Sequence, residues 1–211
     1  MGLLFELQQR INEFGLTLSA KELTLFEIYL QILQEWNKKI NITAIKTTKD
    51  IIIKHFIDSL AVLKYINISG SLVDIGSGGG FPGIPIKINN PSIELTLIEA
   101  NRKKSNFLKT VIRRLGLKHV DVYNGRAEHF DKECFFDIAI SRAFANVADF
   151  CTVAGRLVKN GGMAVAMTGK FPLQNDEQIY AAGFIRETSF SFDLPLNKGH
   201  RTILVLRKCF T

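Results

Sequence analysis

Apolar residues repeat at helical spacing along the first 66 residues of the chain. The first apolar stripe consists of Leu3, Leu7, Ile11 and Phe14. Two further helices are expected after Ser19 and Thr47. Each of these residues is followed three positions later by an acidic residue, Glu22 or Asp50, and this spacing is typical of a capping box. The pattern therefore predicts a helical N-terminal extension over residues 1–66, packed on a core domain over residues 67–211.

From residue 71 onward, short apolar runs alternate with helical segments. The predicted strands are 71–75, 94–99, 119–123, 135–141, 163–168, 184–192 and 201–208. Helices are expected over 101–116 and 145–158, and Asn160–Gly162 is expected to turn the chain. This alternation favours an α/β fold with a mostly parallel sheet and helices on both faces. Because the last two strands have only a short connection, we expect them to pair antiparallel.

Composition narrows the class of protein. The chain has 211 residues, of which 46% are hydrophobic, so it is long enough for one domain with a small extension. No run of about 18 uncharged apolar residues is present, and Glu6 and Arg10 interrupt the start, so we expect neither a membrane span nor a signal peptide. The three cysteines are far apart and the four histidines lack metal-ligand spacing. We therefore expect a cytoplasmic protein without a metal site.

A glycine-rich segment, DIGSGGGFPG (74–83), follows the first predicted strand directly. Glycines at such a turn let the chain bend sharply and let a ligand approach the backbone. The free N–H groups expected at the start of the next helix favour electron-rich ligand atoms. A plain tight turn is the alternative, but four glycines in five positions exceed what a turn needs. The segment thus predicts a nucleotide-like ligand.

Two kinds of ligand are compatible with this loop: a nicotinamide dinucleotide and S-adenosylmethionine. Gly78, Gly80 and Gly83 fit the dinucleotide pattern GxGxxG, which alone does not discriminate between them. Asp74 would attract the cationic methionine portion of S-adenosylmethionine and would repel a pyrophosphate. The antiparallel last strand pair also favours S-adenosylmethionine. Glu99, at the end of the second strand, could take both ribose hydroxyls of either ligand, or could be only a charge that caps the next helix.

The net charge of +7 is concentrated in one stretch. Residues 99–126 hold eight Lys or Arg against two Asp or Glu, a net charge of +6. Such a surface attracts polyanions, although a solvated helix face has the same composition. The predicted RNA-binding residues are Arg102, Lys103, Lys104, Arg113 and Arg114, joined by Lys170 and Arg201 near predicted strand ends.

Four segments together resemble one known family. LVDIGSGGGFPGIPI, with NITAI and KHFIDSL before it and SRAFA after it, is similar to the small-subunit ribosomal RNA methyltransferase G family, also called glucose-inhibited division protein B. The resemblance covers nearly the whole chain. It implies a seven-stranded Rossmann-like methyltransferase sheet of class I, mostly parallel with an antiparallel last strand. It also implies transfer of a methyl group from S-adenosylmethionine to N7 of a guanosine in 16S ribosomal RNA.

The resemblance also implies cofactor contacts at particular positions, in addition to the loop and strand-end candidates Asp74, Gly78 and Glu99. These positions are Gly76, Phe81, Ala127, Glu128 and Arg142. Phe81 has a second interpretation as a core contact, and Glu128 has one as a first-turn helix charge. Arg142 has three interpretations: a contact to guanine O6, a contact to the cofactor carboxylate, or a structural ion pair.

The expected mechanism is an in-line displacement in which positioning replaces a general base, because guanine N7 carries no proton. His55 and Asp58 share a helical face and are expected to tie the extension to the sheet; shaping the RNA entrance is the alternative. We expect a monomer whose partner is 16S ribosomal RNA, either free or in a small ribosomal subunit. Competing hypotheses are a nicotinamide-dependent oxidoreductase, a non-catalytic RNA-binding protein on the same scaffold, and a small-molecule methyltransferase.

Overall fold

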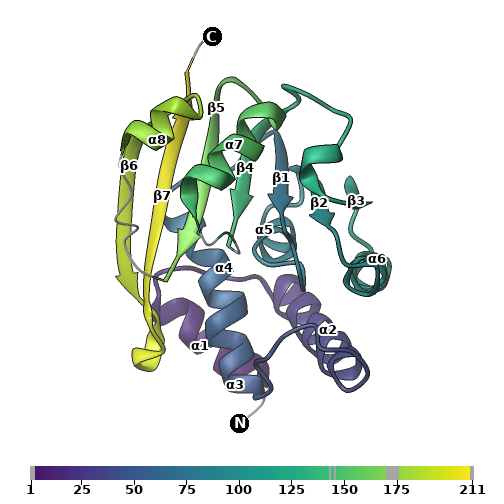
Figure 1. The fold of residues 1–211 in the computed structure, drawn as a ribbon. Helices are drawn as coiled ribbons and strands as arrows, with labels where there is room; N and C mark the ends of the chain where they lie inside the picture. Colours follow the sequence, from purple (N-terminus) through teal and green to yellow (C-terminus); the bar gives the residue numbers. More distant parts are fainter. Residues whose placement is uncertain (1–2, 143, 145, 170–175, 210–211) are drawn as a thin grey trace.

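A computed structural model describes residues 3–142, 144, 146–169 and 176–209. Its centre is a seven-stranded sheet in the order β3-β2-β1-β4-β5-β7-β6 (Figure 1). The strands are β1 (Ser71–Ile75), β2 (Glu94–Glu99), β3 (Val120–Asn124), β4 (Phe136–Ser141), β5 (Val158–Thr168), β6 (Phe184–Asp193) and β7 (His200–Lys208). Strands β1 to β5 pair in parallel, and β7 is antiparallel to both β5 and β6. The predicted α/β class and the antiparallel last pair are confirmed.

Helices cover both faces of the sheet. They are α1 (Leu3–Glu13), α2 (Ala20–Asn37), α3 (Thr48–Ile51), η1 (Ile52–Ile57), α4 (Asp58–Leu60), η2 (Ala61–Lys64), α5 (Gly83–Asn89), α6 (Arg102–Leu115), η3 (Ala127–His129), α7 (Val147–Leu157), α8 (Asp176–Ala181) and η4 (Pro195–Asn197). Successive strand residues point to opposite faces, so Leu72 belongs to a core cluster with residues of α1, α2, α5 and α6, whereas Val73 belongs to a second cluster with residues of α7 and α8. None of the described helices is both long and apolar enough to cross a membrane.

Local sequence signals account for the helix ends. The Ser19 side chain accepts the Glu22 N–H while the Glu22 carboxylate accepts the Ser19 N–H, so the predicted capping box at α2 is present. The Asn101 side chain caps α6, and Gly116 ends that helix in the left-handed region at φ 64°. These caps fix where α6 starts, immediately after β2.

Strand β5 differs from its prediction. It begins at Val158 and runs through Asn160–Gly162, where a turn was expected. Between the pairs Phe136–Val158 and Ile138–Met163, β4 advances two residues while β5 advances five. The three extra residues therefore form an irregularity inside the strand, and pairing on both sides of them outweighs the local turn preference.

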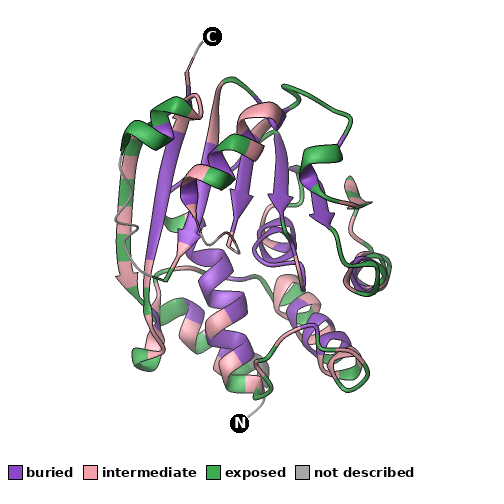
Figure 2. Cartoon of the chain, in the orientation of Figure 1, coloured by how far each residue is buried: buried purple, intermediate pink, exposed green. Residues whose placement is uncertain are grey.

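The N-terminal helices lie at the carboxyl ends of the central strands. In Figure 1 the arrowheads of β1 and β4 point toward α2 and α4. Figure 2 shows that these strands and the helices α4 and α5 consist mostly of buried residues. The N-terminal helices and the sheet share one hydrophobic core. The domain boundary after residue 66 stays a prediction. Ligands of open α/β sheets bind at this edge, and the extension therefore helps to build the site.

One helical segment of the extension is irregular. The helix that begins at Thr48 passes into the π-helical turn η1 before α4. Such turns are rare and occur often at functional sites. His55 lies within η1 and Asp58 follows it, and both side chains are buried.

Candidate functional site

The glycine-rich loop connects β1 to α5 at the carboxyl edge of the sheet. The N–H groups of Gly76 and Ser77 both donate to the carbonyl of Ile98, at 2.9 and 3.0 Å, which anchors the loop to β2. The hydroxyl of Tyr29, from α2, donates to the carbonyl of Gly79 on the other side. The loop is thus held on one side by strand β2 of the sheet and on the other side by helix α2 of the N-terminal extension.

The loop glycines fall into two groups. A Cβ at Gly80 would lie 2.5 Å from Ile84 and one at Gly83 would lie 2.8 Å from Asp74, so these glycines permit close packing inside the protein. Gly78, by contrast, has φ 57°, and a Cβ added there would meet no atom nearer than 3.9 Å. Gly76 is exposed with φ 75°. The open side of the loop therefore carries Gly76 and Gly78, the two glycines predicted to meet the cofactor.

Asp74 lies beneath the loop with no exposed surface. One carboxylate oxygen accepts the Gly83 N–H at 2.9 Å, whereas the other has no hydrogen-bond partner among the described residues. Burial raises the pKa of Asp74 to about 7, against the opposing effects of the Gly83 N–H and the Arg142 charge. A buried carboxylate oxygen without a partner is costly, and a cationic ligand group would satisfy it.

Glu99 ends β2 beside this loop. Its two oxygens accept the N–H groups of Gly78 and Asn101, at 2.8 and 2.7 Å. Each carboxylate oxygen retains a second lone pair, so hydroxyl groups of a ligand can still donate to it. The Asp74 oxygen and the Glu99 carboxylate supply acceptors beside the open glycines, and this arrangement fits S-adenosylmethionine.

Two further predicted cofactor residues, Ala127 and Glu128, follow β3. Ala127 is buried in η3, and its carbonyl accepts a hydrogen bond from Arg156 at 2.7 Å. Glu128 is exposed. The structure therefore keeps Ala127 at the base of this turn and Glu128 at its surface, and the cofactor roles of both stay predictions.

Phe81 is 5% exposed and packs against aromatic residues of the extension. The His55 ring is stacked on it at 4.4 Å between centroids, and the Tyr29 ring at 5.4 Å. The Arg142 guanidinium lies 5.2 Å from the same ring centroid. This placement agrees with the core-contact interpretation of Phe81, and its contact with the cofactor stays a prediction.

Arg142 follows β4 and reaches into the N-terminal extension. Its guanidinium donates to the Lys54 carbonyl at 2.9 Å and to the Asp58 carboxylate at 3.3 Å, and it contacts His55 Nδ1 at 2.9 Å. Asp58 also accepts from Arg201 at 3.0 Å. His55 and Asp58 therefore do tie the extension to the sheet, and the ion-pair interpretation of Arg142 describes part of its contacts.

These side chains border a cleft of about 330 Å³ at the ends of β4 and β5. Its charged lining residues are Lys54, Asp58, Arg142 and Arg201, so the cleft carries more positive than negative charge. Lys170 lies outside the described residues.

The cationic residues of α6 face solvent, as the exposed outer side of that helix in Figure 2 indicates. Arg102, Lys103, Arg113 and Arg114 are exposed and Lys104 is half-buried. Arg114 approaches Glu35 of α2 at 3.8 Å, with both side chains largely exposed. The predicted RNA-binding residues of α6 are thus accessible on one helix, with little ion pairing to compete.

Sequence reasoning missed the role of the connector between α2 and α3. The Asn37 side chain accepts the N–H groups of Ile42 and Thr43 and donates to the Thr43 carbonyl, which fixes the connector. A Cβ at Gly79 would lie 3.1 Å from Ile42, so the connector packs on the loop. The string NITAI, one of the four segments that carry the family resemblance, makes these contacts.

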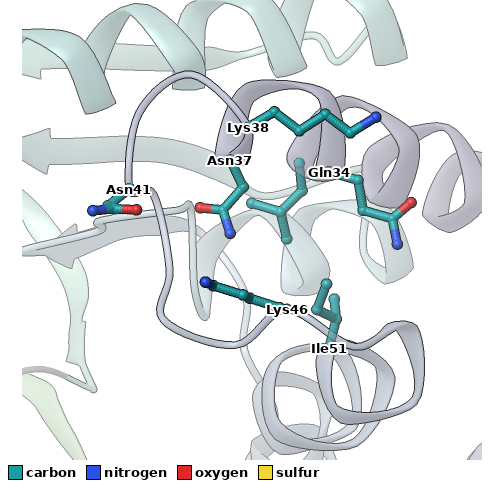
Figure 3. Close-up of a pocket in the computed structure, with 7 residues that line it drawn as sticks. Gln34, Asn37, Lys38, Asn41, Lys46 and Ile51 are labelled. Carbon is teal, nitrogen blue, oxygen red and sulfur yellow. The ribbon is translucent and has the colours of Figure 1, made fainter.

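The connector also lines a polar pocket of about 680 Å³ (Figure 3). The pocket is lined by Leu33, Gln34, Asn37, Lys38, Asn41, Lys46 and Ile51. Figure 3 shows Lys46 and Asn37 among the side chains that line this pocket. Two lysines, three carboxamides and no carboxylate make this lining suited to an anionic, hydrogen-bonding group.

The fold is that of the class I S-adenosylmethionine-dependent methyltransferases. TYW2 of P. horikoshii, solved in complex with MeSAdo, superposes with a TM-score of 0.58 at 17% identity and covers 71% of this chain and 61% of its own. A SAM-dependent methyltransferase from Aquifex aeolicus superposes with a TM-score of 0.55 at 15% identity, covering 71% of this chain and 89% of its own.

Sequence comparison identifies the family within this class. A family model described as rRNA small subunit methyltransferase G matches residues 22–200. The protein of that name from Clostridium botulinum (strain 657 / Type Ba4) is 43% identical over 182 residues, covering 83% of this chain and 75% of the relative. The one from Oenococcus oeni is 39% identical over 212 residues, covering 94% and 86%.

The chain therefore belongs to the rRNA small subunit methyltransferase G family and is an S-adenosylmethionine-dependent enzyme that methylates small-subunit ribosomal RNA. This assignment selects methyl transfer over the nicotinamide-dependent alternative.

Proposed function

We propose that this enzyme transfers a methyl group to N7 of a guanosine in 16S ribosomal RNA, with the cofactor held at the open side of the glycine-rich loop. The observation that carries the proposal is the buried Asp74 oxygen without a hydrogen-bond partner among the described residues, at the start of the loop that carries the exposed Gly76. The choice of N7 follows from the family resemblance. When bound, S-adenosylmethionine supplies the electrophilic methyl group.

The residues of the cleft support a mechanism without a general base. Guanine N7 has a lone pair and no proton to remove, so positioning the base is sufficient. His55, the histidine beside the cleft, has both ring nitrogens engaged, by Thr43 and Arg142, and is not available to take a proton. Gly76 and Gly78 leave room for the cofactor beside the loop backbone. Asp74 attracts the cationic methionine portion of the cofactor, and Glu99 orients its ribose.

Arg142 contributes a fixed cation at the border of the cleft. Its guanidinium has two candidate acceptors, guanine O6 and the cofactor carboxylate, and Arg142→Lys distinguishes them. Loss of S-adenosylmethionine affinity in this variant indicates the carboxylate contact. Unchanged cofactor affinity with a lower kcat/KM for RNA indicates the guanine contact.

We propose that RNA lies across α6 and the polar pocket of Figure 3. Lys38, the C-cap residue of α2, lines the pocket, and Arg114 of α6 approaches Glu35 in the last turn of the same helix, so the pocket and α6 both adjoin the end of α2. Phosphate contacts from such a surface position a folded RNA without reading its sequence. Arg201, which lines the cleft, remains a predicted phosphate contact, as does Lys170, which lies outside the described residues.

The test is to map the methylated base. Small-subunit RNA from cells that lack this enzyme is incubated with labelled S-adenosylmethionine and the protein, as free RNA and as assembled subunits, and digested for mass spectrometry. We expect one 7-methylguanosine. Methyl transfer to an exocyclic nitrogen or to another base contradicts the N7 assignment. Absence of transfer in every assembly state favours the non-catalytic alternative.

A binding test separates the cofactor classes. A ligand that binds only the native state raises the melting temperature. S-adenosylhomocysteine is expected to do so and NADH is not. A shift with NADH alone contradicts the proposed cofactor site.

A further inference from the structure

His55 belongs to the N-terminal extension and lines the cleft, where it is 7% exposed and is contacted by residues of three other segments. Its Nδ1 lies 2.9 Å from an amino group of Arg142. Its Nε2 lies 2.8 Å from the hydroxyl of Thr43 in the connector. Its ring is stacked on Phe81 with an angle of 10° between the planes. The ring is therefore fixed in both position and rotation.

The partners of the two nitrogens determine the protonation of the ring. Arginine has only donors, so Nδ1 of His55 must accept from Arg142. The ring is then neutral with its proton on Nε2, which donates to the Thr43 hydroxyl. Thr43 Oγ1 also accepts the N–H of Ile45 at 3.1 Å, as this arrangement allows.

The surrounding charges agree with a neutral ring. Burial, followed by the positive charge of Arg142, lowers the pKa of His55 to about 3. A hydrogen bond with the Lys54 backbone opposes this lowering of the pKa, and the charge of Lys54 adds to it. Asp58 and Arg201 lie at the same cleft, and Asp58 is shared by Arg142 and Arg201. We therefore expect His55 to stay neutral between pH 5 and pH 9.

We propose that His55 is a positioning residue for methyl transfer: through its Nδ1 acceptor it fixes the orientation of the Arg142 guanidinium above the Phe81 ring. Asp58 neutralises Arg142 but is shared with Arg201, and the Lys54 carbonyl binds the same amino group as Asp58, so His55 alone among these partners holds the other amino group. The stack with Phe81 couples this orientation to the glycine-rich loop. The inference rests on the role of Arg142 in the proposed function.

Two amide substitutions separate the two sides of the ring. In His55→Asn the amide oxygen can occupy the place of Nδ1 and accept from Arg142. In His55→Gln the longer side chain places its amide near the former Nε2, toward Thr43, and leaves Arg142 without its acceptor. His55→Phe retains the stack on Phe81 and removes both hydrogen bonds. A matched control is His119→Asn, because His119 lies outside the site at φ 55°, a conformation that Asn tolerates.

We expect His55→Gln and His55→Phe to lower kcat by about tenfold to a hundredfold, the range for a lost hydrogen bond to a charged group. His55→Asn is expected to retain kcat within about threefold, and the melting temperatures of the three variants are compared so that unfolding is excluded. At saturating S-adenosylmethionine, where the pH dependence of cofactor binding does not limit the rate, wild-type kcat is expected to show no inflection near pH 6.5, the ordinary pKa of histidine. Equal losses in His55→Asn and His55→Gln at equal stability, or full activity of His55→Phe, overturn the proposal.

A double-mutant cycle with Arg142→Lys distinguishes this inference from the proposed function. If Arg142→Lys changes neither cofactor binding nor methyl transfer, the proposed role of Arg142 fails. If Arg142→Lys lowers activity and the effects of His55→Gln and Arg142→Lys multiply as independent losses, only the His55 inference fails. We expect the double variant to be little worse than Arg142→Lys alone.

Discussion

The glycine-rich loop and the outer face of α6 are both predicted to bind ligands, but they differ in how their polar groups are held. At the loop, Asp74 and Glu99 are buried and accept backbone N–H groups at fixed distances. On α6, the cationic side chains face solvent, and Arg114 makes a loose contact at 3.8 Å. A buried site acts through a few exact contacts, whereas an exposed face acts through summed charge that salt screens. Substitutions should therefore have different signatures in the two regions.

The largest effect is expected at the open side of the loop. Gly76→Val places a branched side chain on a residue with φ 75°, in the space where the methionine or ribose part of the cofactor is expected. We expect S-adenosylmethionine affinity to fall about a hundredfold, equivalent to roughly 3 kcal/mol of overpacking. Isothermal titration calorimetry measures this loss. Gly116→Val is the control, because Gly116 also has a positive φ but lies in open space at the end of α6. Unchanged affinity in Gly76→Val contradicts the placement of the cofactor.

Asp74 should give the loop a pH dependence. The pKa of Asp74 is raised to about 7 by burial, so the carboxylate that attracts the cationic cofactor forms only as the pH rises through 7. We expect S-adenosylmethionine affinity to increase about tenfold between pH 5.5 and pH 7.5, consistent with one ionisation of a buried group. In Asp74→Asn the affinity should be low and independent of pH. Parallel pH profiles for both proteins would show that Asp74 does not contact the cofactor.

The same group affects stability with a defined sign. Because the pKa of folded Asp74 lies above its ordinary value of 3.8, its stabilising contribution is complete below pH 4 and is lost as the pH rises to about 7. Without ligand, Asp74→Asn should match the wild type at pH 4 and melt at a higher temperature at pH 7.5. A lower melting temperature of the variant at pH 7.5 contradicts the unsatisfied carboxylate.

The face of α6 should respond to salt instead. Replacing Arg102, Lys103 and Lys104 by Gln is expected to weaken RNA binding about tenfold and to reduce the salt slope by about 2 to 3. Cofactor affinity should not change. Lys21→Gln with Lys132→Gln is a control for general charge, because neither residue lies on α6 or in the pocket. An unaltered salt slope in the α6 variant would identify that face as a solvated surface only.

The smallest effect is expected at the polar pocket lined by the end of α2 and the connector. Lys38→Ala with Lys46→Ala should raise the KM for RNA by about threefold, as for the loss of two exposed phosphate contacts. Lys39→Ala with Lys49→Ala is the matched control, because these lysines lie on the same segments but do not line the pocket. Equal effects of the two pairs would remove the pocket from the RNA surface.

The sequence was most informative where local chemistry decides the structure. The caps at Ser19 and Asn101, the strands flanking the glycine-rich loop and the antiparallel last pair all follow from short-range signals, and the structure confirms them. The run through Asn160–Gly162 was predicted wrongly, because pairing with β4 on both sides of the irregularity outweighs a local turn signal.

The cluster at the cleft was harder to predict because its members are far apart in the sequence. Thr43, His55, Phe81 and Arg142 come from four segments and meet only in the folded chain. Helical spacing placed His55 and Asp58 on one face but gave no indication of the π-helical turn or of the partners. A single sequence shows spacing within an element, and the contacts between elements depend on packing.

The most direct test of the cofactor site is a crystal structure of the protein with S-adenosylhomocysteine. We expect the ligand at the bend after β1, against Gly76 and Gly78, with its amino group toward the free oxygen of Asp74 and its ribose toward Glu99. A ligand bound elsewhere in the chain, with the bend empty, would contradict the assignment of the glycine-rich loop as the cofactor site.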